Sequence, residues 1–486
     1  MAYPSLLYTE MHLEKPIPVS VFEDLQLLNF ISKDTAKTVR YPCSPSDRTS
    51  RRNFFASMKD KKTEEALKNL RDVSAELDRL NALYENSRSN DERYVLFLEL
   101  MKNDAQFTSL AASLGASDRI SALFSSWFAS RLGGRQYTEM RNEIGDIAPE
   151  LEKALVFSLH LCRQDVCFDA KVKESLPEAV RSAGRELGID SVSASTVPER
   201  RISPDILRKA AVENPSVFKK LESFCKRYKP LYSKSITFYH AEIDFYLSLF
   251  GLIKRAEEIG IPFCAVSEST ERIIRATEVY DISLLAKGET KIIPNDTFFN
   301  DSEPFFFLTG ANGGGKTTYL RAIGILTLLH LLGCPVPARS AEIGGIDTVY
   351  THFPRDERFD GSGRFVEEDR RVRSILEKAD GHSLILLNET YSTTNEENAI
   401  RCTSELAEKL NGDKRFGLYI THQHGLKQGN IPYLQVMIDD DDNNRRTFRV
   451  VRNRNERGSF AEDILLRYGL DEKSLEKRFG KLEDNR

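Results

Sequence analysis

A glycine-rich loop between an apolar run and a helix constrains this chain more than any other feature. Residues 305–308 read as a buried strand, and residues 318–323 begin a helix. The loop fits the spacing G-x-x-x-x-G-K-[ST], in which backbone amides wrap phosphates, the lysine reaches the terminal ones and the hydroxyl ligates Mg²⁺. The residues expected to bind a nucleotide are Gly310, Ala311, Asn312, Gly313, Gly314, Gly315, Lys316, Thr317 and Thr318. A glycine-rich turn without a ligand is the alternative, and the flanking strand and helix argue against it.

Composition sets broad limits on the kind of protein. A chain of 486 residues has room for two or three domains. Its net charge of −4 gives no overall attraction to nucleic acid or anionic lipid, so any such surface must be local. The longest apolar stretches, such as residues 323–332, fall far short of the roughly 20 residues of a membrane-spanning helix. The N-terminus lacks a basic region followed by an apolar core, so we expect a cytoplasmic protein without a membrane partner.

The seven cysteines are scattered, odd in number and without C-x-x-C spacing, which indicates reduced thiols. His160, Cys162 and Cys167 come nearest to a metal cluster. On the helical segment that we expect there, these side chains would not converge on one ion, so we predict no structural metal.

The apolar pattern is helical from residue 20 to about residue 260. Alternating spacings of four and three draw one apolar seam along a long helix, through Ala66, Leu70, Val73, Leu77, Leu80 and Tyr84. Further helical patterns lie at residues 96–100, 120–128, 151–161 and 243–259. Polar or proline-containing breaks fall at residues 40–52 and 184–204. We therefore predict an all-α region over residues 1–262.

Short apolar or β-branched runs alternate with helical stretches after residue 262. The runs lie at residues 263–266, 291–293, 305–308, 383–387, 417–420, 434–438 and 447–451. This alternation predicts an α/β domain over residues 263–486, with a mainly parallel sheet flanked by helices. A nucleotide would then lie at the carboxyl ends of the strands, where the glycine loop emerges.

Two of these strands end in polar residues that could act on a bound nucleotide. One leads into Asn388 and Glu389: the amide could hold a Mg²⁺-bound water beside Thr317, and the carboxylate could polarise the attacking water. The other leads into Thr421 and His422, and this histidine could contact the γ-phosphate or that water. Each could instead be an ordinary strand end, but the order of loop, acidic strand and histidine strand favours catalysis by Glu389 and His422.

Together these segments resemble the ATPase end of the MutS-type DNA mismatch repair proteins, within the ABC-type ATPases. Residues 309–321 are similar to that family's T-G-x-N-x-G-G-K-S-T-x-x-R loop, residues 294–296 match its P-N-D element and residues 421–422 its T-H pair. Residues 388–394 stand where the family has D-E, a short turn and a threonine, and the N-E-x-[FY]-S form is similar to small MutS-like proteins of bacteria. Asn388 thus replaces an aspartate, which predicts weaker Mg²⁺ affinity or slower turnover.

The resemblance also implies a partner subunit. Phe365 and Glu368 fit the family's signature segment, and Ser362 and Gly363 complete the residues expected to contact a phosphate held by the other subunit. Simple capping of the helix at residues 370–379 is the alternative. Residues 458–486 resemble the C-terminal helical element that embraces the partner ATPase. The resemblance therefore implies a homodimeric ATPase with ATP as substrate, Mg²⁺ as cofactor, DNA as partner and a helical core and lever before the ATPase domain.

Three classes of function compete at this point. The first is recognition of mismatched or branched DNA, the second is an ATPase acting on structured RNA or ribosomes, and the third is a protein-assembly switch without nucleic acid. Basic residues at 40–52 and 219–234 could contact phosphates, although a solvated helix face explains each as well. Residues 97–99 spell the F-x-E of a mismatch wedge, but they lie in an apolar helix and we expect them to pack in the core.

Overall fold

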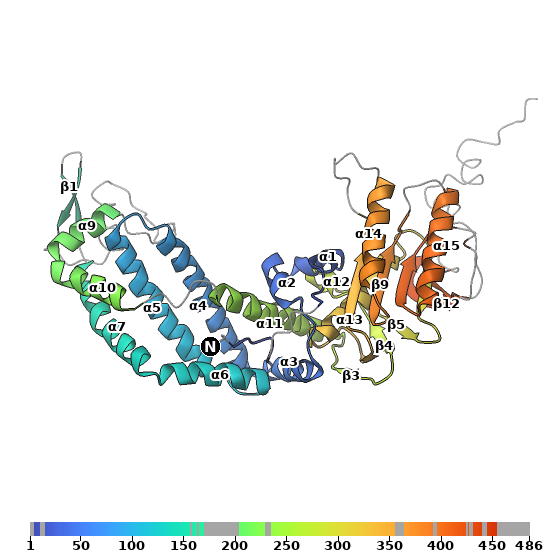
Figure 1. Cartoon of the computed structure of the whole chain (residues 1–486), viewed down its shortest axis with the longest axis horizontal. Coiled ribbons are helices and arrows are strands. Elements are labelled where there is room, and N and C mark those ends of the chain that lie inside the picture. Colours follow the sequence, from blue (N-terminus) through green and yellow to red (C-terminus); the bar gives the residue numbers. More distant parts are fainter. Residues whose placement is uncertain are drawn as a thin grey trace, which may run out of the picture. The chain divides into compact units, whose positions relative to one another are not determined.

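The computed structural model describes residues 4–9, 15–155, 158–162, 165–169, 204–228, 235–354, 364–391, 396–423, 426, 431–439 and 445–453 (Figure 1). The chain forms two compact units. One comprises Met1–Leu6 with Asp60–Ile243, and the other comprises Leu7–Lys59 with Asp244–Arg486. These units do not follow the boundary predicted between residues 262 and 263, because residues 7–59 pack with the α/β part.

The first unit is built from helices, as predicted. Its helices are α4 (Lys61–Glu85), α5 (Asn90–Ala112), α6 (Arg119–Leu132), α7 (Arg135–Ala154), α9 (Pro204–Glu213), α10 (Pro215–Arg227) and the first part of α11 (Ser235–Glu258). The apolar seam of α4 is buried from Leu70 to Leu80, with Leu67 at its start in place of the predicted Ala66. Phe107, Phe128 and Tyr239 pack their rings together in the core, with centroids 5.6 to 5.8 Å apart.

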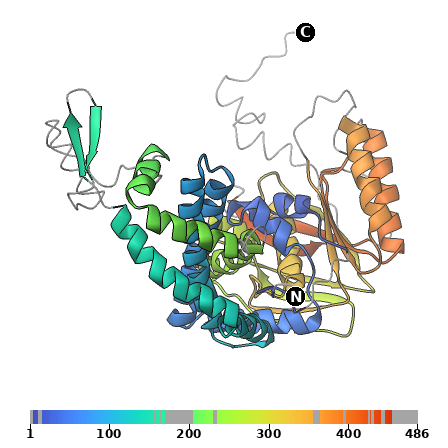
Figure 2. The same ribbon diagram turned by 60° about the vertical axis from the view of Figure 1, so that its left-hand side comes forward.

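Two strands replace the end of one predicted helix in this unit. Helix α7 ends at Ala154, and β1 (Ser158–Cys162) pairs with β2 (Asp165–Asp169) in an antiparallel hairpin (Figure 2). The helix predicted to reach residue 161 was wrong there because Leu159 and Leu161 alternate with polar residues at a period of two. His160, Cys162 and Cys167 therefore lie on strands, and His160 is the register partner of Cys167.

The aromatic residues near the second basic stretch belong to the core. Phe224 and Tyr228 are buried, and Phe224 packs against Phe97 of α5 with ring centroids 5.7 Å apart. Lys220, on the exposed side of α10, forms a surface ion pair with Glu150 of α7 at 2.7 Å. Phe97 and Leu98 are buried as well, which confirms the expectation that the F-x-E segment packs in the core.

Most of the first basic stretch lies in a helix of the second unit, so the break predicted at residues 40–52 is confined to residues 40–44. After α1 (Val19–Asp24), the 3₁₀ helix η1 (Leu27–Asn29) and α2 (Lys33–Val39), α3 spans Pro45–Ser57. The Ser44 hydroxyl caps α3 by accepting a hydrogen bond from the Asp47 amide at 3.1 Å, and Pro45 suits the first turn. Arg51 is 0% exposed and donates to the carbonyls of Leu7 and Leu332 at 2.7 and 2.6 Å. Its guanidinium therefore holds the fold together and is not available to a nucleic acid.

A six-stranded, mainly parallel sheet forms the centre of the second unit, as predicted. Its order is β12 (Arg445–Asn453), β11 (Tyr433–Asp439), β6 (Phe305–Thr309), β10 (Phe416–Ile420), β9 (Ser383–Asn388) and β8 (Thr348–His352). All neighbours are parallel except β11 and β12, which form an antiparallel pair at one edge. The carboxyl ends of β6, β9 and β10 therefore meet at one edge, and β6 leads there into the glycine loop.

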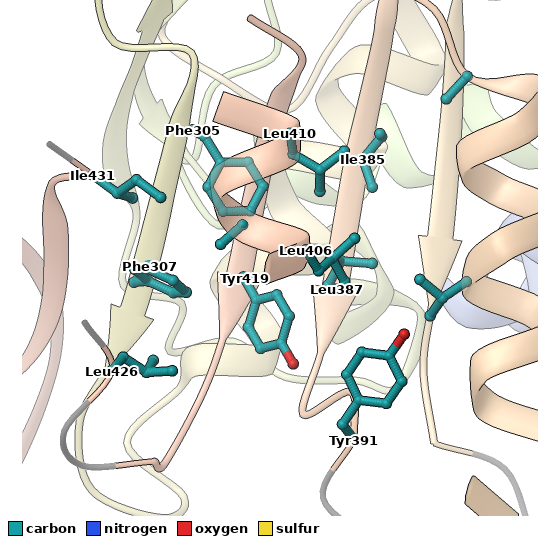
Figure 3. Packing of buried hydrophobic residues seen from close by; sticks show 13 residues of the cluster. Phe305, Phe307, Ile385, Leu387, Tyr391, Leu406, Leu410, Tyr419, Leu426 and Ile431 are labelled. Atoms are coloured by element: carbon teal, nitrogen blue, oxygen red, sulfur yellow. The ribbon is translucent and has the colours of Figure 1, made fainter. Parts of the chain in front are cut away.

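Helices cover both faces of this sheet. Helix α13 (Lys316–Leu331) packs on the face of Leu386, where Gly324 makes room for the Leu386 side chain. On the other face, α14 (Arg364–Lys378) and α15 (Glu396–Gly412) bury a cluster that includes Ile385, Leu387 and Tyr419 beneath Leu406 and Leu410 (Figure 3). Alternate residues of β9 thus face opposite layers, which explains why this strand is buried throughout and apolar from Leu384 to Leu387.

A second sheet of four strands was not predicted. Its order is β3 (Val266–Glu268), β7 (Ser340–Gly344), β4 (Ile273–Val279) and β5 (Asn295–Asn300). The strand expected at residues 291–293 was wrong, since β5 begins at Asn295 after Pro294. The short helix α12 (Ile282–Ala286) follows β4. Among the described residues, none of the helices combines the length and apolar character needed to cross a lipid bilayer.

Candidate functional site

The glycine loop lies between β6 and α13, as the sequence predicts. Gly310, Gly313 and Gly315 have φ angles of 136°, 67° and 101°, a region that other residues rarely adopt. Gly314 is needed for space, because a Cβ there would lie 3.0 Å from the Ala311 carbonyl oxygen and 3.1 Å from Cγ1 of Val436. The loop therefore turns tightly onto the N-terminus of α13, where unpaired amides and the helix dipole favour an anion.

Lys316 is folded back onto the loop. Its Nζ donates to the carbonyls of Gly310 and Ala311 at 2.7 and 3.1 Å, and the residue is only 5% exposed. The pKa of Lys316 is lowered to about 8, chiefly by burial. The Glu389 carboxylate opposes this shift, and the Arg446 guanidinium adds to it. The Lys316 ammonium is thus poorly solvated at the loop, and a bound anion would stabilise its charge.

Glu389 and His422 meet at the carboxyl ends of neighbouring strands. Asn388 of β9 is the register partner of Ile420 of β10, and the Glu389 amide donates to the Ile420 carbonyl at 3.0 Å. His422 Nε2 lies 2.9 Å from Glu389 Oε1. The two residues proposed for catalysis are therefore in direct contact.

The backbone at Glu389 is in a conformation that glycine favours. Its φ is 50°, and Tyr391 two residues on has a φ of 64°. A buried network holds this turn: Thr390 Oγ1 lies 2.9 Å from His352 Nδ1, and the Tyr419 hydroxyl donates to the Thr390 carbonyl at 2.5 Å. The surrounding contacts thus fix the direction in which the Glu389 side chain leaves the strand.

The electrostatics of Glu389 suit a carboxylate that stays ionised. Its hydrogen bond to His422 lowers the pKa of Glu389 below its ordinary value, burial opposes this, and the charges of His422 and Lys316 lower it further. Glu389 is therefore an acceptor at neutral pH. Because Lys316 also responds to Glu389, the cation and the carboxylate share one electrostatic environment.

Asn388 carries an oxygen without a partner. The residue is 8% exposed, and its Oδ1 is buried with no hydrogen bond from any residue that the structure describes. Buried amide oxygens are normally satisfied, and a neutral oxygen of this kind suits the water shell of a hard cation. Thr317, the other residue predicted for the metal, lies one residue after Lys316 in the first turn of α13.

A cavity of about 210 Å³ adjoins the loop. Its lining includes Gly315, Thr318 and Tyr319, several residues between Val279 and Asn295, and Phe448. Phe448 is 44% exposed and has a φ of 55° within a bulge, where β11 and β12 shift register between Val436 and Ile438. The bulge redirects this aromatic ring toward the cavity.

The β11–β12 hairpin packs against the loop, a feature that the sequence analysis missed. A Cβ at Gly310 would lie 3.0 Å from Val436 Cβ, one at Gly315 would lie 3.2 Å from Phe448 Cδ1, and one at Gly313 would overlap Nη1 of Arg446. The sequence from Asp439 to Arg446 is a run of charged and polar residues without any periodicity that would indicate such a role.

The residues predicted for contact with a partner subunit are described only in part. Ser362 and Gly363 lie outside the described residues, as do residues 458–486. Phe365 packs against Tyr391 with ring centroids 5.7 Å apart, and Glu368 is buried within α14. These two side chains therefore take part in the fold of their own subunit, and the contact between subunits stays a prediction.

The site lies in an α/β domain whose glycine loop follows a strand at the carboxyl edge of a mainly parallel sheet. Comparison with known families makes this more specific, because MutS domain V matches residues 306–474. This C-terminal part of the chain is therefore similar to the MutS family.

Individual relatives agree with this assignment over the same part of the chain. The DNA mismatch repair protein MutS of Chlorobaculum tepidum is 31% identical over 175 residues, which are 36% of this chain and 20% of that protein. MutS 1 of Haloarcula marismortui is 34% identical over 139 residues, or 28% and 15%. The mouse DNA mismatch repair protein Msh3 is 28% identical over 204 residues, or 42% and 18%. The chain thus spans about a fifth of the length of the relatives that it matches.

Proposed function

We propose that this chain binds ATP and hydrolyses it to ADP and phosphate, and that the cycle drives a conformational change. One observation carries the proposal: the carboxylate of Glu389, paired with His422 at 2.9 Å, lies in the electrostatic environment of a buried lysine on a glycine loop. A phosphate cradle and a water-activating group are thus combined at one edge of one sheet.

The loop would hold the phosphates. Amides of residues 312–316 and the N-terminus of α13 supply donors, and the Lys316 ammonium would exchange its contacts with the Gly310 and Ala311 carbonyls for phosphate oxygens. The neighbouring cavity, with the Phe448 ring at its wall, has room for the nucleoside.

Magnesium is the cation that we propose for this site. The Thr317 hydroxyl and, through water, the unpaired Oδ1 of Asn388 would hold it, and the fit rests on that buried unpaired oxygen. The ion would neutralise charge on the phosphates. Because Asn388 is neutral, we expect this shell to bind the ion more weakly than one containing an aspartate.

Glu389 would orient the attacking water. Its ionised carboxylate would accept a hydrogen bond from that water and take up its proton as the water oxygen bonds to the terminal phosphorus and the bond to the bridging oxygen breaks, which releases ADP and phosphate. His422 holds Glu389 in place and would contact the terminal phosphate. The fixed turn at Thr390 would keep this geometry during turnover.

Two further parts of the proposal concern partners. We propose a homodimer and DNA binding coupled to the nucleotide cycle, supported by the resemblance of residues 306–474 to proteins named for DNA mismatch repair. A protein-assembly switch without nucleic acid, the third class named above, is another candidate, because Arg51 of the first basic stretch is buried and donates to backbone carbonyls. An ATPase acting on structured RNA, the second class named above, is the remaining alternative to test.

Nucleotide binding by Lys316→Ala and turnover by Glu389→Gln test the enzymatic part. Lys316→Ala should abolish ATP binding, and Glu389→Gln should bind ATP but lose hydrolysis, while Lys409→Ala on the exposed side of α15 serves as a control. Full hydrolysis by both site variants would refute the assignment.

Binding to nucleic acid at low and high salt tests the partners. Binding that distinguishes a mismatched duplex from homoduplex DNA supports the first class, and preference for structured RNA supports the second. No binding of mismatched, branched or homoduplex DNA or of RNA at low salt supports the third, because phosphate contacts strengthen as counterions are diluted.

A further inference from the structure

The β11–β12 hairpin brings a second cation to the glycine loop. Arg446 lies near the start of β12, opposite Ile438 in the register, two residues before the bulged Phe448. Its Nη1 donates to the Gly313 carbonyl at 2.9 Å. The guanidinium occupies the space that a side chain at position 313 would need, so the positive φ of Gly313 and the absence of its Cβ both allow this approach.

Arg446 and Lys316 are like charges that act on each other across the loop. Arg446 is among the groups that lower the pKa of Lys316, and Glu389 is the carboxylate that opposes it. That carboxylate is shared with His422. The two cations repel each other when no anion is bound, and a bound polyanion would attract both of them.

Among the residues that the structure describes, the contact with Gly313 engages one donor of the Arg446 guanidinium and leaves the others available to a ligand. An arginine carries five N–H donors in a planar fork that matches the oxygens of a phosphate, and one of them is engaged with the Gly313 carbonyl. The Arg446 side chain can therefore keep its contact with the Gly313 carbonyl and still bind a phosphate in bidentate geometry.

We propose that Arg446 binds the phosphates of the nucleotide held by the loop, as a second cation beside Lys316. This inference rests on the proposed function, since it assumes that the loop binds a nucleotide. It also assigns a role to the hairpin, because β12 brings to the site a positive charge in addition to that of Lys316. The neutral Asn388 makes this added charge more important, because the metal shell has one negative group fewer to recruit Mg²⁺.

The test measures dissociation constants of ATP, ADP and AMP for the whole chain by calorimetry. Arg446→Gln should weaken ATP binding about tenfold or more, the loss expected for a charge-assisted hydrogen bond, and should change AMP binding little. Arg446→Lys, which keeps the charge but not the fork, should lie between. Arg452→Gln is the matched control, because Arg452 lies on the same strand and pairs with Glu303 at 2.8 Å.

Each outcome decides between this role and another. An unchanged ATP constant in a folded Arg446→Gln protein overturns the proposal, and tighter binding shows instead that the guanidinium obstructs the loop. Equal losses of affinity for ATP and AMP would show that Arg446 acts on the nucleoside cavity, and this outcome would also overturn the proposal. If Lys316→Ala abolishes binding and Arg446→Gln does not weaken it, only the role of Arg446 fails; if the unaltered chain binds no ATP, the proposed function fails first. Thermal melts show that each variant is folded.

Discussion

Raising the pH should weaken nucleotide binding through the titration of Lys316. Burial against the loop lowers the pKa of this lysine to about 8, whereas an ordinary lysine has a pKa of 10.5. Phosphate binding restores the charged form, because a nearby polyanion raises the lysine's pKa. Below pH 8 the ammonium is already present, and above pH 8 the ligand must bind together with a proton. Affinity should therefore be lost as the pH rises through 8.

The magnitude follows from the fraction of protein that carries the ammonium. With a pKa of 8, about three quarters of the molecules are charged at pH 7.5 and about one tenth at pH 9, so ATP affinity should fall about eightfold across this range. Glu389, whose pKa is held below its ordinary value, is already ionised throughout. Lys316 is therefore the group whose charge changes.

Calorimetry in buffers of different ionisation enthalpy measures the proton directly. Binding should take up roughly 0.2 proton at pH 7.5 and roughly 0.9 proton at pH 9, if the bound lysine is fully charged. A dissociation constant that stays flat between these pH values, with no proton uptake, would refute the reasoning. It would mean that the ammonium is well solvated in the free protein and is not the group that the phosphates capture.

Three substitutions test other parts of the structure. Asn388→Asp should lower the Mg²⁺ concentration for half-maximal nucleotide binding, and an unchanged Mg²⁺ dependence would separate this residue from the ion. Arg51→Met should lower the free energy of unfolding by about 3 kcal/mol, because two buried carbonyls lose their donor; a melting temperature equal to that of the unaltered chain would contradict this. Gly344→Ala should lower the free energy of unfolding by about 1–3 kcal/mol, because the added methyl group overlaps the carbonyl oxygens of Ser269 and Glu271. Denaturant unfolding measures this, and an unchanged midpoint would show that the backbone shifts to accommodate the methyl group.

The parts of the site that the sequence predicts are those built from continuous segments. The run at residues 305–308, the glycine loop and the following helix are adjacent in the chain, so pattern and spacing suffice to place them. The contact between Glu389 and His422 was predictable in outline because both follow strands of a parallel sheet, whose ends share one edge.

The parts that the sequence did not predict depend on distant pairings. Strand β4 was not expected, and its place between β5 and β7 is set by partners that follow it along the chain. Arg51 shows the limit in another way. A charged residue reads as exposed, yet this one is buried because two backbone carbonyls and the Tyr8 ring surround its guanidinium. Arg446 and Phe448 contact the loop because of a β-bulge in the β11–β12 pair, and no spacing of residues in the sequence predicts this bulge.

The hairpin that packs on the glycine loop has a consequence for how the molecule matures. Arg446 is 133 residues away from Gly313 along the chain. A ribosome therefore completes the loop and its helix long before it makes Val436, Arg446 and Phe448, and contacts of such separation form late. A nascent or truncated chain ending before residue 433 would display the complete glycine motif without the side chains that cover it.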